Sequence, residues 1–498
     1  MRVDLAKRKP QWHNSRKIQE RIYIRGRLVL QTPAHFGNGD TDAITDIPLL
    51  RDSLDGRSPL LPGTSIAGAL RNYLREAEAG FGADEDPDCD TRLLAEQLFG
   101  YLEGREGSVM SCLMVDDARG ALPADAAIEI RDGVVIDPDR RIAEIDKKGK
   151  GKKFDLELLP AGTSFPLSLE LVVYEGDNRL KEALAIALHG LEEGLIGLGM
   201  RKRRGYGRCK VSGWQVNAYP MNTAQGLIGW LTHPEETAGA EAWQPGIASL
   251  LQVPELPDTA TECFEIDAEF QLESSLLIRS STGNGDDADA VHLRSWRNGR
   301  QVPVLSGTSL AGVIRSRARK IAVTLKGEAA AQEYIDRMFG RRIRHSKDIP
   351  SGSRVIVHET EIRAGIRDQV QTRVKIDRFT GGAFPQALFS QQPVFAGESD
   401  PATVRIRMQL RKTADAEAFF HAEIGLLLLV LKDLWTGDLP LGGESSIGRG
   451  RLKGMKADLK FPGQAWRLET GPDGKMLIGG DTQFLEEQFL QAFLKEQP

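Results

Sequence analysis

Two acidic loops carry side chains suited to chemistry on a phosphate group. One runs from His35 to Asp46 and the other from residue 281 to Asp289, and both are rich in Gly, Asn and Asp. A carboxylate there can hold Mg²⁺, which neutralises phosphate charge during hydrolysis. An aspartate in a Gly- and Asn-rich loop is also an ordinary turn residue. Loop composition alone therefore does not decide whether these aspartates bind a catalytic metal ion or only form turns.

A second pair of matching segments indicates how such loops are positioned. Leu61–Arg71 reads LPGTSIAGALR and Leu305–Arg315 reads LSGTSLAGVIR. A turn followed by Thr-Ser predicts a helix start whose side-chain oxygens cap the first amides, and the apolar spacing beyond it predicts an amphipathic helix. A helix start followed by an arginine can bind an anion, although a capped helix with a surface arginine is the commoner arrangement. The candidate anion contacts are Ser65, Arg71, Ser309 and Arg315.

Basic residues are clustered, although the net charge is only −5. The clusters are at 147–153, 201–204, 315–320 and 341–345. Each one taken singly is typical of a solvated face, but together they indicate contact with a polyanion. The cluster Arg201, Lys202, Arg203 and Arg204 lies inside a Gly-rich segment, GLGMRKRRGYG, which suits close approach to phosphates, and Tyr206 is a candidate to stack on a base. The strand pattern after it argues against a dinucleotide-binding loop.

The composition bounds the class of protein. With 498 residues, 41% hydrophobic and 27% charged, the chain can form roughly two to four packed domains. The cysteines at 89, 112, 209 and 263 fit neither a metal knuckle nor a disulfide framework. The basic N-terminus has no signal-peptide pattern, and the apolar stretch Ile424–Leu431 is too short to span a membrane. We expect a cytoplasmic protein without a membrane partner.

The two halves repeat one domain. Gly63 and Gly307 lie 244 positions apart, Asp46 and Asp289 lie 243 apart, and Gly100 and Gly340 lie 240 apart. Landmarks in the same order at nearly the same offset indicate a duplication. Each half alternates strands and helices as a split βαβ unit, which predicts two α+β, ferredoxin-like domains. We expect domains over 1–219 and 262–462, a linker over 220–261 and a tail over 463–498, with protruding hairpins at 131–160 and 371–396.

These motifs resemble the RAMP superfamily. The Gly-rich loop after the first strand, the G-T-S-x-A-G-x-x-R helix start, the Phe-Gly and the closing Gly-rich segment all occur in order, twice. The arrangement is similar to the backbone subunit of type III CRISPR effectors, here as two fused units. The resemblance implies binding of guide crRNA and of complementary single-stranded target RNA, together with other CRISPR effector subunits. It also implies hairpins that kink the duplex, with apolar tip candidates Ile142, Ile145, Phe379 and Phe384.

The resemblance further implies target cleavage by a loop aspartate with Mg²⁺ or Mn²⁺. The motif places that aspartate on Asp46 and Asp289, which would also be the metal ligands, with Asp40, Asp42, Asp286 and Asp287 as fallback candidates. One carboxylate on a loop is a weak metal site, so RNA would have to supply much of the coordination.

RNA contacts follow from the same resemblance. His35 matches a family histidine associated with the guide, and the second half is expected to carry Ser281 there. The remaining candidates are Gly37, Gly39 and, from the closing Gly-rich segment of the second half, Arg449.

Two other functions stay open. One is a metal-independent nuclease that processes the guide precursor, with His35 as an acid–base group. The other is an RNA-binding scaffold without catalysis.

Overall fold

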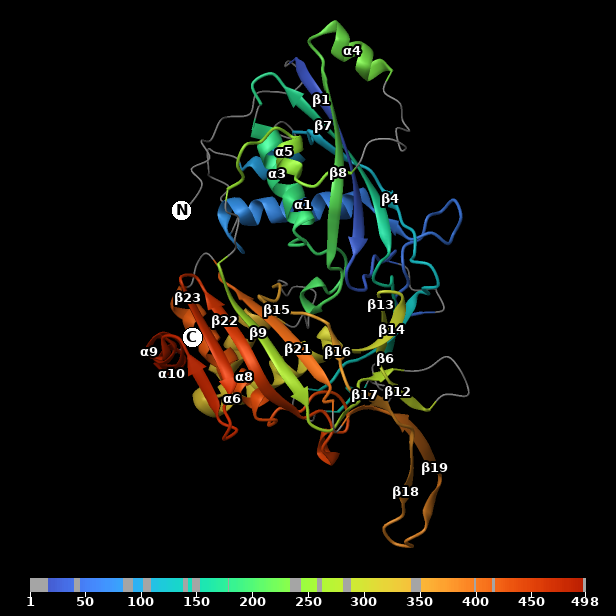
Figure 1. Ribbon diagram of the computed structural model, residues 1–498, viewed down its shortest axis with the longest axis vertical. Helices are drawn as coiled ribbons and strands as arrows, with labels where there is room; N and C mark the ends of the chain where they lie inside the picture. The colour runs from blue at the N-terminus through green and yellow to red at the C-terminus, as the bar shows by residue number, and fades with distance from the viewer. Residues whose placement is uncertain are drawn as a thin grey trace.

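A computed structural model describes residues 17–39, 45–83, 93–101, 109–137, 142–145, 153–177, 179–232, 243–257, 262–280, 288–341, 351–397, 400–413 and 417–495. Two hydrophobic cores divide this chain. One is built from residues between Ile22 and Leu251, the other from residues between Phe264 and Phe493. We call the corresponding halves domain 1 and domain 2, which are the upper and lower parts of Figure 1.

Domain 1 is an antiparallel sheet covered by helices. The strand order is β3-β7-β1-β8, which is the order of a ferredoxin-like fold. Alternating residues of the central strand β1 point inward, so that Ile22, Ile24 and Leu28 are buried beneath the helices. The main elements are β1 Ile18–Leu30, α1 Gly63–Ala79, α2 Leu94–Phe99, β3 Leu113–Val115, β7 Ser164–Tyr174, α3 Arg179–Glu192, the short 3₁₀ helix η2 Lys202–Arg204 and β8 Cys209–Pro220.

Domain 2 repeats this order and extends it. Its sheet runs β13-β14-β16-β21-β9-β22-β23-β24, with β15 also paired to β21. The elements are β9 Cys263–Leu272, α6 Gly307–Lys326, α7 Glu328–Phe339, β15 Val355–Val357, β16 Thr360–Arg363, β21 Thr403–Arg411, α8 Glu417–Trp435, η3 Ser445–Ile447, β22 Leu452–Phe461, β23 Gln464–Thr470 and β24 Met476–Gly479. The apolar helix α8 lies in this core, and in the described part of the chain no helix is long and apolar enough to cross a bilayer. Two α+β domains of one topology are thus confirmed.

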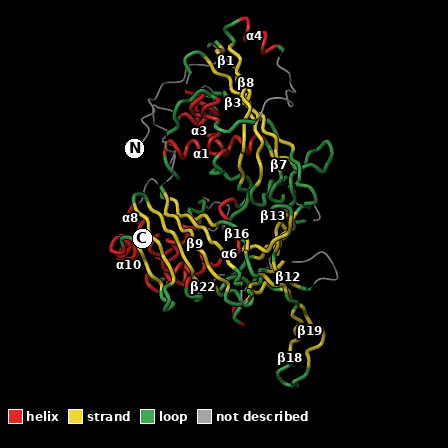
Figure 2. Tube along the Cα trace, in the orientation of Figure 1, coloured by secondary structure: helices red, strands yellow, loops and turns green. Residues whose placement is uncertain are grey.

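Each domain carries a β-hairpin outside its main sheet. In domain 1 it is formed by β5 Glu129–Val134 and β6 Lys153–Leu158, and in domain 2 by β18 Gln371–Ile376 and β19 Ala383–Gln392. The second hairpin projects far from the body, at the bottom of Figure 1, whereas β6 is drawn among strands of domain 2, near β14 and β17. Figure 2 shows that the projection consists of strand and turn alone.

Short strands line the surface where the domains meet and the base of the second hairpin. They are β2 Leu60–Leu61, β4 Ala118–Arg119, β10 Ser275–Leu276, β11 Arg279–Ser280, β12 Ala290–His292, β13 Arg294–Arg297, β14 Arg300–Leu305, β17 Ile366–Asp368 and β20 Val394–Ala396.

The segments expected as linker and tail pack against the domains. Residues 220–261 contain α4 Ala224–Leu231 and α5 Ile247–Leu250, and Ile247 is fully buried in the first core. After β24 the chain forms α9 Thr482–Phe484, a π-helical turn η4 Leu485–Leu490 and α10 Gln491–Lys495. Phe489 and Phe493 from this segment are fully buried in the second core. Because these two aromatic side chains are buried, the segment packs against domain 2.

The expected Thr-Ser caps are wrong. Helix α1 has Pro62 and helix α6 has Ser306 at the N-cap position, and neither makes a side-chain capping bond. Both helices begin at the glycine, one residue before Thr64 and Thr308 in the sequence. In α1 the amide of Gly63 donates to the carboxylate of Asp117 at 2.7 Å. An aspartate from the connection between β3 and β4 thus takes the capping role.

Candidate cleavage centres and nucleic-acid interface

Asp46 is an exposed side chain tied to the hairpin of domain 1. Its Oδ2 accepts a 2.9 Å hydrogen bond from the main-chain amide of Asp155 on β6. The main-chain amide of the next residue, Ile47, donates to the main-chain oxygen of Asp155 at 3.1 Å, so Asp46 and Ile47 lie alongside β6. Asp132 on β5 lies nearby and, by its hydrogen bond, raises the pKa of Asp155, with burial adding to the effect. Lys153 contacts Asp132 at 3.1 Å and offsets part of this negative charge.

Asp289 repeats this arrangement in domain 2. Its Oδ2 accepts hydrogen bonds from the main-chain amide of Ser390 on β19, at 2.6 Å, and from the Ser390 hydroxyl, at 3.1 Å. These bonds lower the pKa of Asp289, an exposed group. Both expected catalytic aspartates therefore attach to the second strand of their own hairpin.

Neither centre alone provides a full set of metal ligands. Among the described residues there is no group of three or more His, Cys, Asp or Glu side chains placed to hold an ion. The side chain next to Asp289 is a serine, Ser390. Near Asp46, Lys153 partly offsets the negative charge of the neighbouring carboxylates Asp132 and Asp155. The residues present do not fit an autonomous Mg²⁺ or Mn²⁺ site. The fallback residues Asp40, Asp42, Asp286 and Asp287 lie outside the described residues.

His35 is buried rather than displayed. Its side chain belongs to a residue that is 1% exposed, and Nδ1 lies 2.7 Å from the main-chain oxygen of Glu157. Burial lowers its pKa, and the nearby charge of Arg201 acts in the same direction. Nε2 has no hydrogen-bond partner and faces Gly37, where a Cβ atom would lie 2.7 Å from it. His35 therefore supports the loop from within and is not presented as an acid–base group.

The residue equivalent to His35 is Leu277, so the expected match with Ser281 is wrong. The amide of Met200 donates to the His35 oxygen at 3.1 Å, and the amide of Gly443 donates to the Leu277 oxygen at 2.8 Å. Met200 and Gly443 lie 243 positions apart, as the duplication requires. An apolar side chain fills this place in domain 2. Ser281 itself lies outside the described residues.

The basic segment Arg201–Arg204 lies at the boundary between the domains. Arg203 donates to the main-chain oxygen of Ser353 and stacks on Phe81, 5.2 Å from the ring centroid. The main-chain oxygen of Arg204 faces the start of α6, where a Cβ on Gly307 would lie 2.2 Å from it. Lys202 and Arg204 have exposed side chains. This segment joins the domains, and only part of its charge is presented to solvent.

Tyr206 and Arg449 occupy equivalent buried positions, 243 residues apart. Tyr206 is 2% exposed and the Arg131 guanidinium covers its ring at 5.3 Å, so the expectation that this ring is available to stack on a base is wrong. Arg449 is 3% exposed and contacts Glu444 at 3.1 Å, so it is not displayed to a ligand either. Both side chains pack beneath the hairpins.

The other predicted contacts lie on the loops and helix starts. Gly37, Gly39 and Ser65 are exposed, whereas Ser309, Arg71 and Arg315 are partly buried. Arg315 donates to the oxygen of Gly340 at 3.3 Å, which links α6 to the end of α7.

The hairpin tips expose apolar side chains. Phe379 at the tip of the second hairpin is 100% exposed, and Phe384 is 45% exposed with Lys375 over its ring at 4.7 Å. Ile142 and Ile145 near the first tip are 50% and 57% exposed. Ile376 and Leu388 of the second hairpin are also exposed, and a group of exposed apolar side chains on one element, unlike a single one, indicates an interaction surface.

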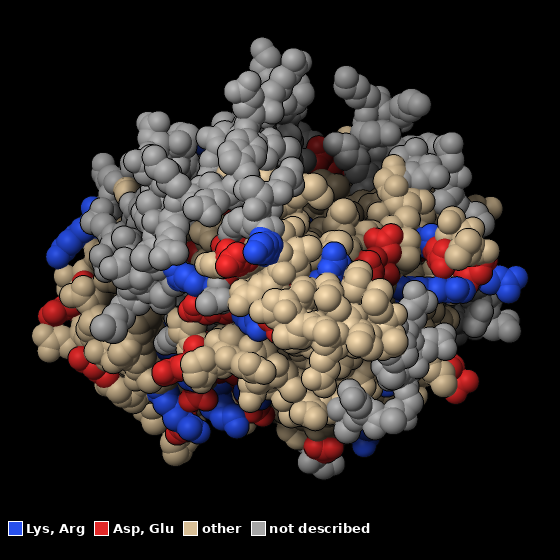
Figure 3. Space-filling model, turned by 90° about the horizontal axis from the view of Figure 1, so that it is seen from above, with Lys and Arg blue, Asp and Glu red and all other residues tan. Residues whose placement is uncertain are grey.

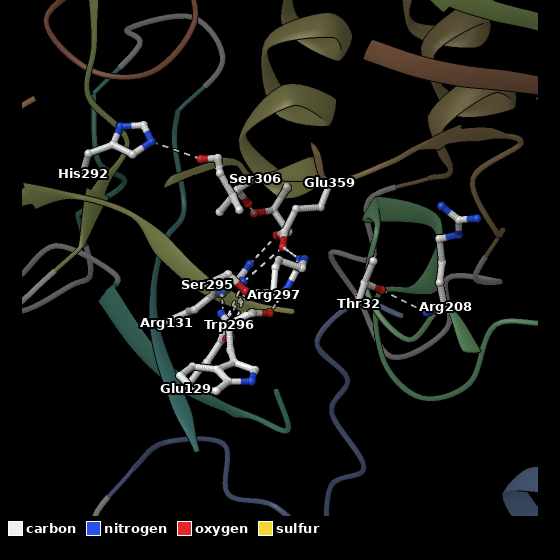
Figure 4. A network of polar contacts seen from close by, with 12 residues as sticks. Thr32, Glu129, Arg131, Arg208, His292, Ser295, Trp296, Arg297, Ser306 and Glu359 are labelled. Carbon is white, nitrogen blue, oxygen red and sulfur yellow. Dashed lines mark hydrogen bonds and ion pairs between the residues drawn. The ribbon is translucent and has the colours of Figure 1, made fainter. Parts of the chain in front are cut away.

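A buried polar network joins the two domains, and sequence reasoning missed it. Arg131 on β5 contacts Glu359 of domain 2 with both Nη atoms, and Glu359 also accepts from Arg297 at 2.5 Å (Figure 4). Glu129 accepts from the Ser295 hydroxyl at 2.8 Å and from the Trp296 amide at 2.9 Å. The side chain of Glu359 is 0% exposed. No local motif marks these residues, because Arg131 and Glu359 lie 228 positions apart.

The charge at the far end of domain 1 is mixed. Seen from above, the described surface shows Lys and Arg interspersed with Asp and Glu around an uncharged area (Figure 3). The continuous basic surface typical of nucleic-acid binding is not present on the described part of this end. The predicted RNA contacts lie elsewhere, on the loops, on the helix starts and on the segment between the domains.

Comparison with known proteins supports the duplication. The family model described as the RAMP superfamily matches residues 27–210 and again residues 269–453. No curated protein matches the chain. The two matches coincide with the two folded repeats and together span most of the chain. The chain belongs to the RAMP superfamily, as a tandem pair of RAMP domains.

Proposed function

We propose that this protein is a backbone subunit of a type III CRISPR ribonucleoprotein that binds guide crRNA and cleaves complementary target RNA at two spaced sites. One observation carries the proposal: in both repeats an exposed aspartate is tied to a main-chain amide on the second strand of the hairpin of its own domain. A repeated placement of an exposed carboxylate is not explained by turn formation, because its partner is over 100 residues away in each repeat.

The hairpins and the aspartates work together in this proposal. An exposed apolar tip such as Phe379 can insert between base steps and unstack them, at a cost of a few kcal/mol that backbone contacts offset. A target strand distorted at the tip presents its phosphates to the base of the same hairpin, where Asp289 lies. The bond from Ser390 holds the carboxylate in one orientation, and the lowered pKa of Asp289 keeps it ionised at neutral pH.

A divalent ion would neutralise charge on the scissile phosphate. Because each centre offers few protein ligands, most of its coordination would come from RNA oxygens and water. The protein itself supplies one oriented carboxylate in each repeat.

Cleavage by the assembled complex tests the proposal. An end-labelled target complementary to the guide should yield two cuts at a fixed spacing in Mg²⁺, and none in EDTA. Asp46→Ala should remove one product and Asp289→Ala the other. Asp55→Ala is the matched control, because Asp55 is an exposed turn aspartate that binds Ser58 and Arg119.

Two other outcomes would identify a different function. Trimming of a guide precursor that resists EDTA would indicate a processing nuclease. Intact guide binding without any product would indicate a scaffold and would refute catalysis.

A further inference from the structure

The hairpin of domain 1 is anchored in domain 2. Arg131 and Glu129 on β5 have side chains that are 4% and 6% exposed, and their partners are Glu359, Ser295 and Trp296 of the other domain. Burial of charged groups is costly unless each is paired. Here burial opposes ionisation of Glu359, but the guanidinium groups of Arg131 and Arg297 outweigh it, and the pKa of Glu359 lies below its usual value.

This anchor is connected to Asp46 through a short path. β5 pairs with β6 in antiparallel register, with Asp132 opposite Asp155 and Arg131 opposite Leu156. The amide of Asp155 then holds the Asp46 carboxylate. The route from Glu359 to the first centre therefore consists of one ion pair, one strand pair and one hydrogen bond.

The second centre has its anchor in its own domain. Arg373 on β18 pairs with Phe389, the neighbour of Ser390, and its side chain contacts Glu444 at 3.3 Å. Glu444 also holds Arg449 at 3.1 Å and Arg279 at 3.1 Å. The base of the second hairpin is thus fixed by a carboxylate from the η3 loop of domain 2.

The two domains carry opposite charges at one position of their closing Gly-rich segments, and this accounts for the difference in how the hairpins are anchored. Arg201 and Glu444 lie 243 positions apart, and both have left-handed backbone conformations, with φ of 55° and 60°. In domain 2 the glutamate attracts the hairpin arginine. In domain 1 the arginine stacks on Phe154 of β6 at 4.9 Å and brings no negative charge to the hairpin, so the buried Arg131 needs a counter-charge from another part of the chain. Glu359 supplies it.

We propose that Glu359 is a positioning residue for the Asp46 centre, whereas Glu444 positions the Asp289 centre. This rests on the proposed cleavage function. Cleavage at the first site then requires that the two domains are docked, and cleavage at the second site does not.

Glu359→Gln tests this in the assembled complex, since it removes the charge and keeps the size. The cut assigned to Asp46 should fall about tenfold or more, because small displacements of a reacting group cost this much. The cut assigned to Asp289 should stay within twofold. Glu361→Gln is the matched control, because Glu361 lies two residues further along, on β16, and its ion pairs at 3.9 and 3.5 Å are with the exposed Arg300 and Arg363. Glu444→Gln should show the reverse selectivity.

Amide exchange provides a readout that is independent of activity. In Glu359→Gln the amide of Asp155 should lose protection, and the amide of Ser390 should keep it. Glu129→Gln weakens the same anchor from the domain 1 side and should have the same effect on the amides of Asp155 and Ser390. This second variant replaces Glu359→Gln if that variant does not fold. An equal fall of both cuts, or unchanged Asp155 protection, would overturn the inference. If the wild-type complex gives no cleavage, the proposed function fails, and amide exchange still decides the positioning role.

Discussion

Gly450 lies against the main-chain oxygen of Leu441 so closely that a Cβ atom would be 1.9 Å from it. Gly207 has the same relationship to Leu198, at 1.8 Å. Both have positive φ, 77° and 69°. The closing Gly-rich segments of both repeats therefore need glycine for close main-chain contact within each domain, as well as for backbone conformation.

Gly450→Ala should destabilise domain 2 by about 2–5 kcal/mol, the sum of backbone strain and overpacking. Gly448→Ala separates the two causes, because Gly448 has φ of 89° but open space around its missing Cβ. That control should lose only about 1 kcal/mol. Urea unfolding of both variants measures the difference. Equal losses would contradict the steric argument.

Arg201→Glu should weaken domain docking. A glutamate at this position would compete with Glu359 for Arg131, as Glu444 attracts Arg373 in domain 2. We expect the two domains to unfold in separate thermal transitions in the variant, whereas the wild-type protein should show more coupled melting. Lys202→Glu changes charge equally at an exposed neighbouring side chain and is the control. Separate transitions in both variants would indicate a general charge effect.

Acid should destabilise domain 2 through His292. Burial lowers the pKa of His292 to about 4. Its Nε2 lies 3.1 Å from the oxygen of Val304, and Nδ1 faces the amide of Ile278 at 3.3 Å, which suits the neutral ring. Because the folded pKa is lowered, the contribution to stability is complete above about pH 6.5 and is lost as the pH falls towards 4, by up to about 3 kcal/mol.

Urea unfolding between pH 7.5 and 4.5 measures this dependence. His292→Gln should show a flatter pH profile over this interval. An unchanged slope in the variant would exclude His292 as its source.

Phe379→Ala should leave stability nearly unchanged, because this side chain is fully exposed. Target binding or cleavage at the second site should fall, because the tip no longer unstacks bases. Phe379→Leu, which keeps an apolar tip, should retain most of the activity. Melting curves and the two-site cleavage assay measure both quantities. Full activity in Phe379→Ala would show that the tip is not a wedge.

The fold could be predicted from sequence because its signals are local. Strand alternation in β1 and β9 and the repeated helix starts mark each domain, and the repeated spacing marks the duplication. The caps were mistaken because Gly63 finds its partner in Asp117, 54 residues away. Local patterns cannot reveal such a partner.

The site could be predicted only in part, for the same reason. The aspartates were found from loop motifs, but their attachment to Asp155 and Ser390 depends on strands over 100 residues away. The predicted exposure of Tyr206 and Arg449 was wrong, because the hairpins cover both side chains. The sequence around these residues does not show which part of the chain packs over them. Glu359 carries no local motif, and its partners Arg131 and Arg297 lie 228 and 62 positions away.

The packing of Phe489 and Phe493 into the second core has a consequence for biosynthesis. Domain 1 closes its core with Ile247 and Leu251, so it can fold while the ribosome is still translating the second repeat. The second core stays incomplete until residue 493 has emerged. A nascent chain arrested between the repeats should therefore already resist protease over domain 1, while its β5–β6 hairpin still awaits the surface that will hold it.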